Sequence, residues 1–117
     1  MDRGNILVVD DEPINYKLLN VILGQEGYKV EYADGGYSAV EMVGKFDYNL
    51  VIMDLKMPDM TGIEASKQIK KLKPKVNIVA SSAVNNIEKS EYMLFNDFLS
   101  KPINRGQLLE IVEKYAK

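Results

Sequence analysis

The 117-residue chain contains neither cysteine nor histidine. The lack of cysteine excludes disulfides and thiolate metal sites, which suits a reducing cytosol. The lack of histidine excludes imidazole acid–base catalysis, His-ligated zinc and a phosphohistidine on this chain. Any chemistry must therefore come from carboxylates, hydroxyls, amines and the backbone.

Long hydrophobic runs are also missing. No apolar stretch approaches the roughly 18 residues that a membrane span requires. The N-terminal sequence MDRGN lacks the hydrophobic region of a signal peptide. We therefore expect a soluble, cytoplasmic protein that makes no membrane contact. Its 46% of hydrophobic and 27% of charged residues are typical of a globular domain, and its length predicts one domain over residues 1–117.

A large net charge is absent as well. The chain carries −2 at neutral pH, so we expect no direct binding to nucleic acid. The charge is nevertheless uneven: residues 1–64 contain 12 acidic and 5 basic side chains, whereas residues 65–117 contain 5 acidic and 10 basic ones. Much of the basic excess lies in KQIKKLKPK, residues 67–75, where the pattern favours a solvated helix end over a binding patch.

Short apolar stretches alternate with helical patterns along the whole chain. The predicted strands are residues 5–9, 28–33, 49–53, 76–81 and 97–100. Pro13 suits the first turn of a helix and Gly27 suits its end. A weak helical pattern lies within residues 85–94. Four further helices are predicted, each with one apolar face. In chain order, these faces comprise Ile14, Leu18, Val21 and Ile22 in the first helix; Ala39, Met42, Val43 and Phe46 in the second; Ala65, Ile69 and Leu72 in the third; and Leu108, Ile111, Val112 and Tyr115 in the last.

This alternation predicts an α/β fold: a doubly wound sheet of five parallel strands with helices on both faces. In such a fold, ligands bind at the carboxyl ends of the strands, near the point where the strand order reverses.

Polar side chains gather at this predicted edge. Asp10 and Asp11 follow the first strand, Asp54 follows the third, Ser82 the fourth and Lys101 the fifth. Clustered carboxylates repel one another unless a cation joins them, and Mg²⁺ prefers such oxygen ligands. An acceptor carboxylate, Mg²⁺, an ammonium and a hydroxyl together indicate a phosphoryl-transfer site. Each residue alone has an ordinary explanation as a cap, a turn residue or a surface charge, so the prediction depends on their combination.

Three motifs carry a resemblance to a known family. ILVVDDEP, YNLVIMDLKMPDMTG and FLSKPI, in this order, resemble the receiver (CheY-like) domain of two-component response regulators. The resemblance extends from about residue 5 to residue 115. It implies the flavodoxin-like strand order 2-1-3-4-5, for which chemotaxis receivers are the standard example.

The resemblance also implies roles for the acidic residues. Asp54 would accept a phosphoryl group from the phosphohistidine of a sensor histidine kinase or a histidine phosphotransfer protein. Asp11, Asp54 and the backbone carbonyl of Lys56 would bind Mg²⁺ directly, and Asp10 would act through the water shell of the metal. Lys101 would pair with the phosphoryl oxygens.

A second group of residues would form the switch. Ser82 matches the switch hydroxyl, Phe98 the switch aromatic residue and Ala83 the small residue beside the phosphoryl group. Lys101–Pro102 matches a cis peptide bond of the family. The resemblance thus implies a phosphorylation-activated signalling switch. Such a switch is not a turnover enzyme, although it is expected to catalyse its own phosphorylation and slow autodephosphorylation.

One segment departs from the family pattern. Only 18 residues, 83–100, separate Ser82 from Lys101, so we predict that the fourth helix is shortened by about one turn or irregular. Tyr92, Met93 and Phe95 are predicted to pack in the core under this segment rather than to form a partner surface.

This departure keeps an alternative open, namely a receiver-like protein-binding module that does not use phosphate. A hydrolase or nucleotide-binding enzyme is weakened by the lack of a glycine-rich phosphate loop. The sequence leaves open the cognate kinase, the downstream protein target and the oligomeric state.

Overall fold

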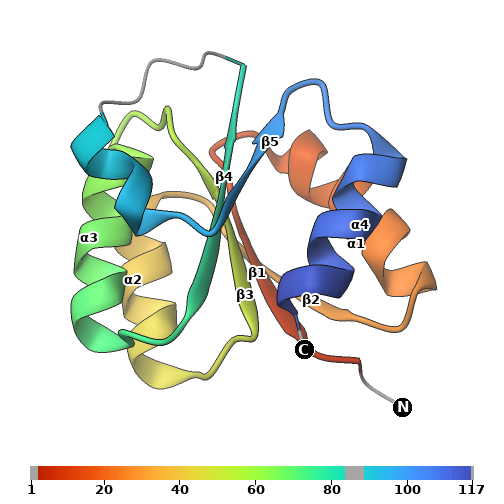
Figure 1. Ribbon diagram of the computed structural model, residues 1–117, viewed down its shortest axis with the longest axis horizontal. Coiled ribbons are helices and arrows are strands. Elements are labelled where there is room, and N and C mark those ends of the chain that lie inside the picture. The colour runs from red at the N-terminus through yellow and green to blue at the C-terminus, as the bar shows by residue number, and fades with distance from the viewer. Residues whose placement is uncertain (1–2, 84–88, 117) are drawn as a thin grey trace.

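The computed structural model describes residues 3–83 and 89–116. Helices and strands alternate along this part of the chain (Figure 1). The strands are β1 (Asn5–Val9), β2 (Lys29–Ala33), β3 (Leu50–Asp54), β4 (Asn77–Ser82) and β5 (Asp97–Ser100). The helices are α1 (Pro13–Gln25), α2 (Gly36–Lys45), α3 (Gly62–Leu72), the 3₁₀-helix η1 (Lys89–Leu94) and α4 (Arg105–Tyr115).

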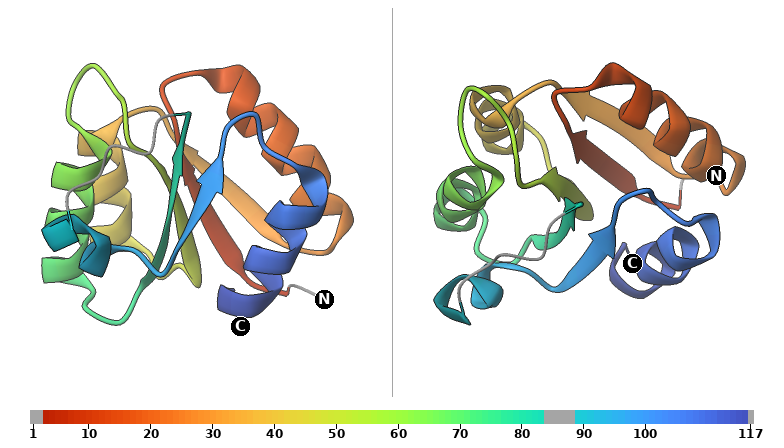
Figure 2. Two further views of the ribbon diagram at one scale, coloured as in Figure 1. Left: turned by 45° about the horizontal axis from the view of Figure 1, so that its top comes forward. Right: turned by 90° about the horizontal axis from the view of Figure 1, so that it is seen from above.

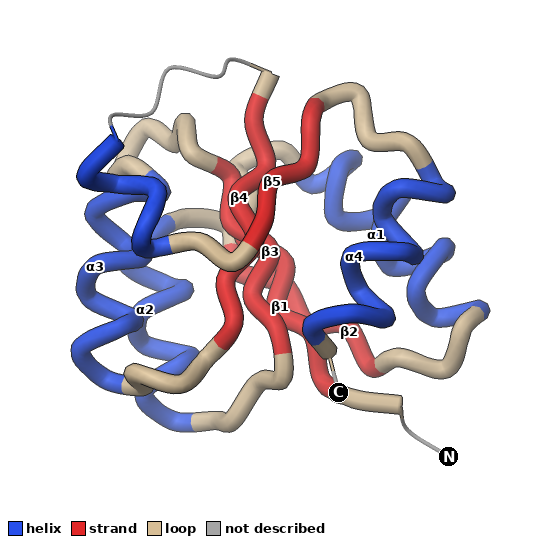
Figure 3. The backbone as a smooth tube through the Cα atoms, viewed as in Figure 1, coloured by secondary structure: helices blue, strands red, loops and turns tan. Residues whose placement is uncertain are grey.

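The five strands form one parallel sheet in the order β2-β1-β3-β4-β5, which confirms the predicted fold and strand order. Figure 3 shows the sheet as a middle layer. Helices α1 and α4 cover one of its faces, and α2, α3 and η1 cover the other (Figures 1 and 3).

Strand β3 lies at the centre of the sheet, and all five of its residues are buried. Val51 and Met53 pack in the apolar layer beneath α2 and α3, whereas Leu50 and Ile52 pack beneath α1 and α4. Burial on both faces explains why this strand is a continuous apolar run rather than an alternating one.

Helix α1 buries a different stripe from the one predicted. Of the predicted residues only Ile22 is buried, and Ile14, Leu18 and Val21 are exposed. The buried stripe consists of Leu19, Ile22 and Leu23. Both stripes have helical spacing, so the periodicity of this largely apolar helix could not decide which side faces the sheet.

Two further apolar residues were placed wrongly. Phe46 and Leu72 are exposed, although both were predicted to face inward. Phe46 is the C-cap of α2 and has an extended backbone, so the helical stripe ends before it. Leu72 is the last residue of α3. In α4, Leu108, Ile111 and Val112 are buried as predicted, and Tyr115 is partly buried against the same apolar layer.

The segment between β4 and β5 is irregular, as predicted, in the part that the structure describes. Residues 89–94 form the 3₁₀-helix η1, while residues 85–88 of the predicted weak helix lie outside the described residues. Phe95 is buried, but Tyr92 is exposed and Met93 is 90% exposed. The predicted core position is therefore confirmed for Phe95 and wrong for Tyr92 and Met93. Among the residues described, no helix is long and apolar enough to cross a membrane.

Candidate phosphoryl-transfer site

The predicted acidic residues meet at the carboxyl edge of the sheet, which Figure 2 shows from above. Strands β1 and β3 are neighbours, and their register pairs Val9 with Met53. Asp10 directly follows β1 and Asp54 is the last residue of β3. Because parallel neighbouring strands end at the same edge, this register brings the two carboxylates side by side.

Lys101 joins these two carboxylates from the end of β5. Its Nζ lies 3.0 Å from Asp10 Oδ2 and 3.3 Å from Asp54 Oδ1. The side chains of Asp10 and Asp54 are only 6% and 7% exposed, and that of Lys101 is 21% exposed. Because one ammonium serves two buried carboxylates, removal of Lys101 would leave two buried negative charges without their ion-pair partner. The Lys101–Pro102 peptide bond is cis, as predicted.

Asp10 is the most firmly held residue of the site. Its Oδ1 accepts the backbone N–H of Glu12 at 2.9 Å, and its Oδ2 accepts the side-chain amide of Asn15 at 3.1 Å. The Tyr32 hydroxyl donates to the Asp10 carbonyl at 2.8 Å, and the Tyr32 ring stacks on Tyr16 at 4.6 Å between centroids. Sequence reasoning missed Asn15 and Tyr32; the only signal for Asn15 is its place in the first turn of α1, close to the acidic pair.

The three carboxylates fit a divalent cation. One carboxylate oxygen each from Asp10, Asp11 and Asp54 lies within 4.8 Å of the others. Asp11 is exposed, so its carboxylate faces the open side of the site. Hard oxygen donors of this kind suit Mg²⁺. The structure also places the backbone N–H of Lys56 3.3 Å from Asp54 Oδ1, while a metal-binding role for the Lys56 carbonyl stays a prediction.

The electrostatics of the site favour cation binding. Burial raises the pKa of Asp54; the Lys101 charge opposes this rise, and the charge of Asp10 adds to it. Burial lowers the pKa of Lys101, but its hydrogen bond with Asp10 and the charges of Asp54 and Asp10 outweigh that effect and raise it. Lys101 is therefore protonated at neutral pH. The ionised form of Asp54 is disfavoured in the site, and a bound cation would stabilise it.

The structure shows the contacts of some predicted switch residues but does not test their roles. The Ser82 carbonyl accepts the Lys101 N–H at 3.1 Å, which connects the ends of β4 and β5. Phe98 packs in the apolar layer beneath α2 and α3, where its ring meets Tyr92 edge-on at 5.5 Å and Phe95 at 5.8 Å. Ala83 is an exposed residue directly after β4. The switching roles of Ser82 and Phe98 stay predictions.

A doubly wound sheet whose carboxyl edge combines three aspartates and a lysine defines a class of phosphoryl-accepting signalling domains. The chain belongs to the family of response regulator receiver domains, because the model of that family matches residues 6–113. It is a receiver domain homologous to those of hybrid histidine kinases and response regulators, and thus a signalling switch rather than a classical enzyme.

Individual relatives agree with this assignment. The signal transduction histidine-protein kinase BarA of Escherichia coli K12 is 33% identical over 115 residues, which cover 94% of this chain but only 12% of BarA. The response regulator TrrA of Thermotoga maritima, solved in complex with Mg²⁺ and BeF, is 33% identical with a TM-score of 0.89 over 98% of this chain and 99% of that one. The receiver domain of sensor histidine kinase PA1611 of Pseudomonas aeruginosa, with a magnesium ion in its active site cleft, is 29% identical with a TM-score of 0.87 over 97% of both chains.

Proposed function

We propose that this domain accepts a phosphoryl group on Asp54 from the phosphohistidine of a sensor histidine kinase or a histidine phosphotransfer protein. The phosphorylated form would then bind a downstream protein. The observation that carries this proposal is the position of Lys101 Nζ, within 3.3 Å of both Asp10 and Asp54. The position supplies a fixed positive charge where a phosphoryl group on Asp54 would lie.

The chemistry requires positioning and charge neutralisation more than proton transfer. A carboxylate oxygen of Asp54 attacks phosphorus, the P–N bond of the donor breaks, and the imidazole leaves with the bonding electrons. Lys101 neutralises charge on the phosphoryl oxygens, and the rigid β3 backbone fixes the direction of attack. Asp11, Asp54 and the Lys56 carbonyl would hold Mg²⁺, with Asp10 acting through bound water, and the ion would supply further positive charge at the phosphoryl oxygens.

Phosphorylation would bias the domain between two conformations, which differ around Ser82 and Phe98. Slow loss of the phosphoryl group to water would return it to the resting conformation. A specific observation keeps the phosphate-independent binding module as a second candidate. In its described residues, the segment between β4 and β5 contains a 3₁₀-helix instead of a regular helix.

The two candidates are separated by labelling with a small phosphodonor such as acetyl phosphate. We expect a mass gain of one phosphoryl group with Mg²⁺, no gain in EDTA and no gain for Asp54→Asn. Labelling that Asp54→Asn leaves unchanged would refute Asp54 as the acceptor. If the folded wild-type chain takes up no phosphoryl group from acetyl phosphate or a phosphorylated histidine phosphotransfer protein, the phosphate-independent module is favoured.

A further inference from the structure

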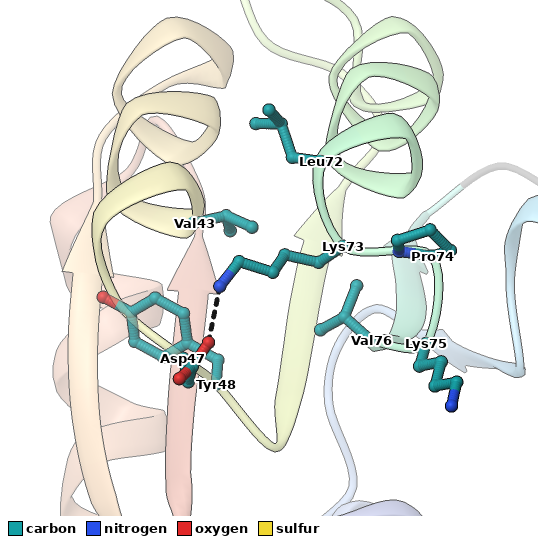
Figure 4. Close-up of a pocket in the computed structure, with 8 residues that line it drawn as sticks. All are labelled: Val43, Asp47, Tyr48, Leu72, Lys73, Pro74, Lys75 and Val76. Carbon is teal, nitrogen blue, oxygen red and sulfur yellow. Dashed lines mark hydrogen bonds and ion pairs between the residues drawn. The ribbon is translucent and has the colours of Figure 1, made fainter.

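A cavity of about 420 Å³ lies at the opposite edge of the sheet from the phosphoryl-transfer site, between the ends of α2 and α3 (Figure 4). Its walls are mostly apolar. They are formed by Val43 of α2, Tyr48 of the α2–β3 connection, Leu72 of α3, and Pro74 and Val76 of the α3–β4 connection. This volume accommodates one large apolar side chain.

An ion pair crosses the mouth of this cavity. Lys73 extends between the apolar walls, and its ammonium pairs with the carboxylate of Asp47 (Figure 4). The Asp47 side chain is 92% exposed, so water screens the pair and the pair contributes little to stability. The carboxylate of another molecule can therefore replace Asp47 at low cost. The position of Asp47 therefore shows where a carboxylate can bind the Lys73 ammonium beside the apolar cavity.

The surrounding positive charge is not neutralised by the domain itself. Lys71 and Lys75 are exposed and form no ion pair with any residue in the described ranges 3–83 and 89–116. Lys70 differs from these two lysines, because its ammonium donates a hydrogen bond to the Val76 carbonyl within the domain. The end of the basic run at residues 67–75, interpreted above as a solvated helix end, thus borders a cavity whose mouth carries the Lys73–Asp47 ion pair.

We propose that this cavity and its lysines form a docking site for an acidic segment of a partner protein. One large apolar side chain of that segment would enter the cavity, and a neighbouring carboxylate would take the place of Asp47 on Lys73. Charge complementarity favours a segment with several carboxylates over a small monocarboxylate, because the exposed Lys75 also lines the cavity and adds a second positive charge to that of Lys73.

This site does not depend on the proposed phosphoryl transfer. Its lining residues Tyr48 and Val76 precede β3 and β4 at the amino-terminal edge of the sheet, whereas Asp54 ends β3 at the carboxyl edge. A partner bound there leaves the carboxylate site accessible to a phosphodonor. The experiments below therefore use the domain without phosphorylation, and their failure would leave the proposal for Asp54 untouched.

The first experiment titrates the ¹⁵N-labelled full chain with a synthetic peptide that has one leucine flanked by two glutamates on each side. We expect saturable shifts of backbone amide signals concentrated in residues 43–48 and 72–76. A peptide with serine in place of leucine, and one with lysines in place of glutamates, should each bind at least about tenfold more weakly. Equal binding of the serine peptide, or shifts spread over the whole surface, would overturn the proposal.

The second experiment uses pairs of variants with matched charge. Lys73→Met should weaken binding of the leucine peptide about tenfold, whereas Lys17→Met, on α1 across the sheet, should leave it within about twofold. Asp47→Asn should strengthen binding by freeing Lys73. Glu41→Gln, which frees Lys45 outside the cavity, should strengthen it less. If Lys73→Met and Lys17→Met had equal effects, or Asp47→Asn and Glu41→Gln did, the peptide would be bound only by the general charge of the domain. Either result would refute the proposed site.

Discussion

The shared ammonium of Lys101 allows a quantitative prediction about stability. Lys101→Met keeps most of the apolar stem but removes the positive charge between Asp10 and Asp54. At an effective dielectric constant of about 20, unit charges at 3.0 and 3.3 Å attract each other by about 5 kcal/mol per pair. Much of this attraction is offset by the cost of desolvating the ammonium, so the net effect is far smaller than the sum.

We therefore expect the free energy of unfolding to fall by about 3 kcal/mol, the lower end of the range for breaking a buried ion pair. The lower end applies because each carboxylate keeps other donors. Asp10 retains the Glu12 N–H and the Asn15 amide, and Asp54 retains the Lys56 N–H.

Urea unfolding at neutral pH in EDTA, followed by far-ultraviolet circular dichroism, measures this change directly. Lys45→Met is the matched control, since it removes an exposed ammonium paired with Glu41 and should cost less than about 0.5 kcal/mol. Mg²⁺ should restore part of the loss in Lys101→Met by supplying positive charge at the same carboxylates. A loss below about 1 kcal/mol for Lys101→Met would refute the view that this charge compensates two buried carboxylates.

Three other predictions test neighbouring features. Asp54→Asn should raise the free energy of unfolding in EDTA, because burial and Asp10 disfavour the ionised side chain, and it should reduce stabilisation by Mg²⁺; a variant less stable than wild type in EDTA would contradict this. Asp59→Asn should cost about 1 kcal/mol at pH 7, since the Asp59 carboxylate caps α2 by accepting the Gly36 and Tyr37 N–H groups. Burial would raise the pKa of Asp59, but these and other backbone N–H groups outweigh it and lower the pKa. The cost should therefore begin to decrease as the pH falls below the ordinary aspartate pKa of about 4, and it should disappear only below the lowered pKa of Asp59 in the folded state. A cost independent of pH would reject the assignment. Gly62→Ala should destabilise the fold by several kcal/mol and impair labelling of Asp54, because the added Cβ would lie 2.8 Å from Leu55 Cα and also clash with the Asp54 carbonyl; Gly24→Ala, which meets nothing within 4 Å, is the control.

The sheet and the acidic centre could be predicted because both depend on short-range patterns. The run Leu50–Met53 is apolar at every position, which indicates a strand buried on both faces, and Asp54 ends it. Once the strands are parallel and β1 neighbours β3, the residues that follow them must meet at one edge. The one long-range contact that this inference needs, the pairing of β1 with β3, came from the strand order that the family resemblance implied.

The residues that surround the centre depend on contacts that no local pattern encodes. Asn15 reaches the Asp10 carboxylate from the first turn of α1, and Tyr32 reaches the Asp10 carbonyl from the neighbouring strand β2. Asp59 caps α2 from a loop 23 residues further along the chain. Tyr92 and Met93 likewise lie in the 3₁₀-helix η1, where Met93 is exposed and the half-exposed Tyr92 contacts Phe98 of β5.

The contacts of Asp10 also bear on how the three aspartates divide their roles. An ionised carboxylate offers about four lone-pair sites, and those of Asp10 already receive the Glu12 N–H, the Asn15 amide and the Lys101 ammonium. Only about one of these sites is left, so Asp10 could bind a metal ion directly only in close competition with the three donors that it already holds. The Asp11 carboxylate is exposed and accepts no hydrogen bond from the residues described, so it can bind a cation without such competition. The hydrogen bonds therefore favour direct Mg²⁺ binding by Asp11 and Asp54, with Asp10 acting through bound water.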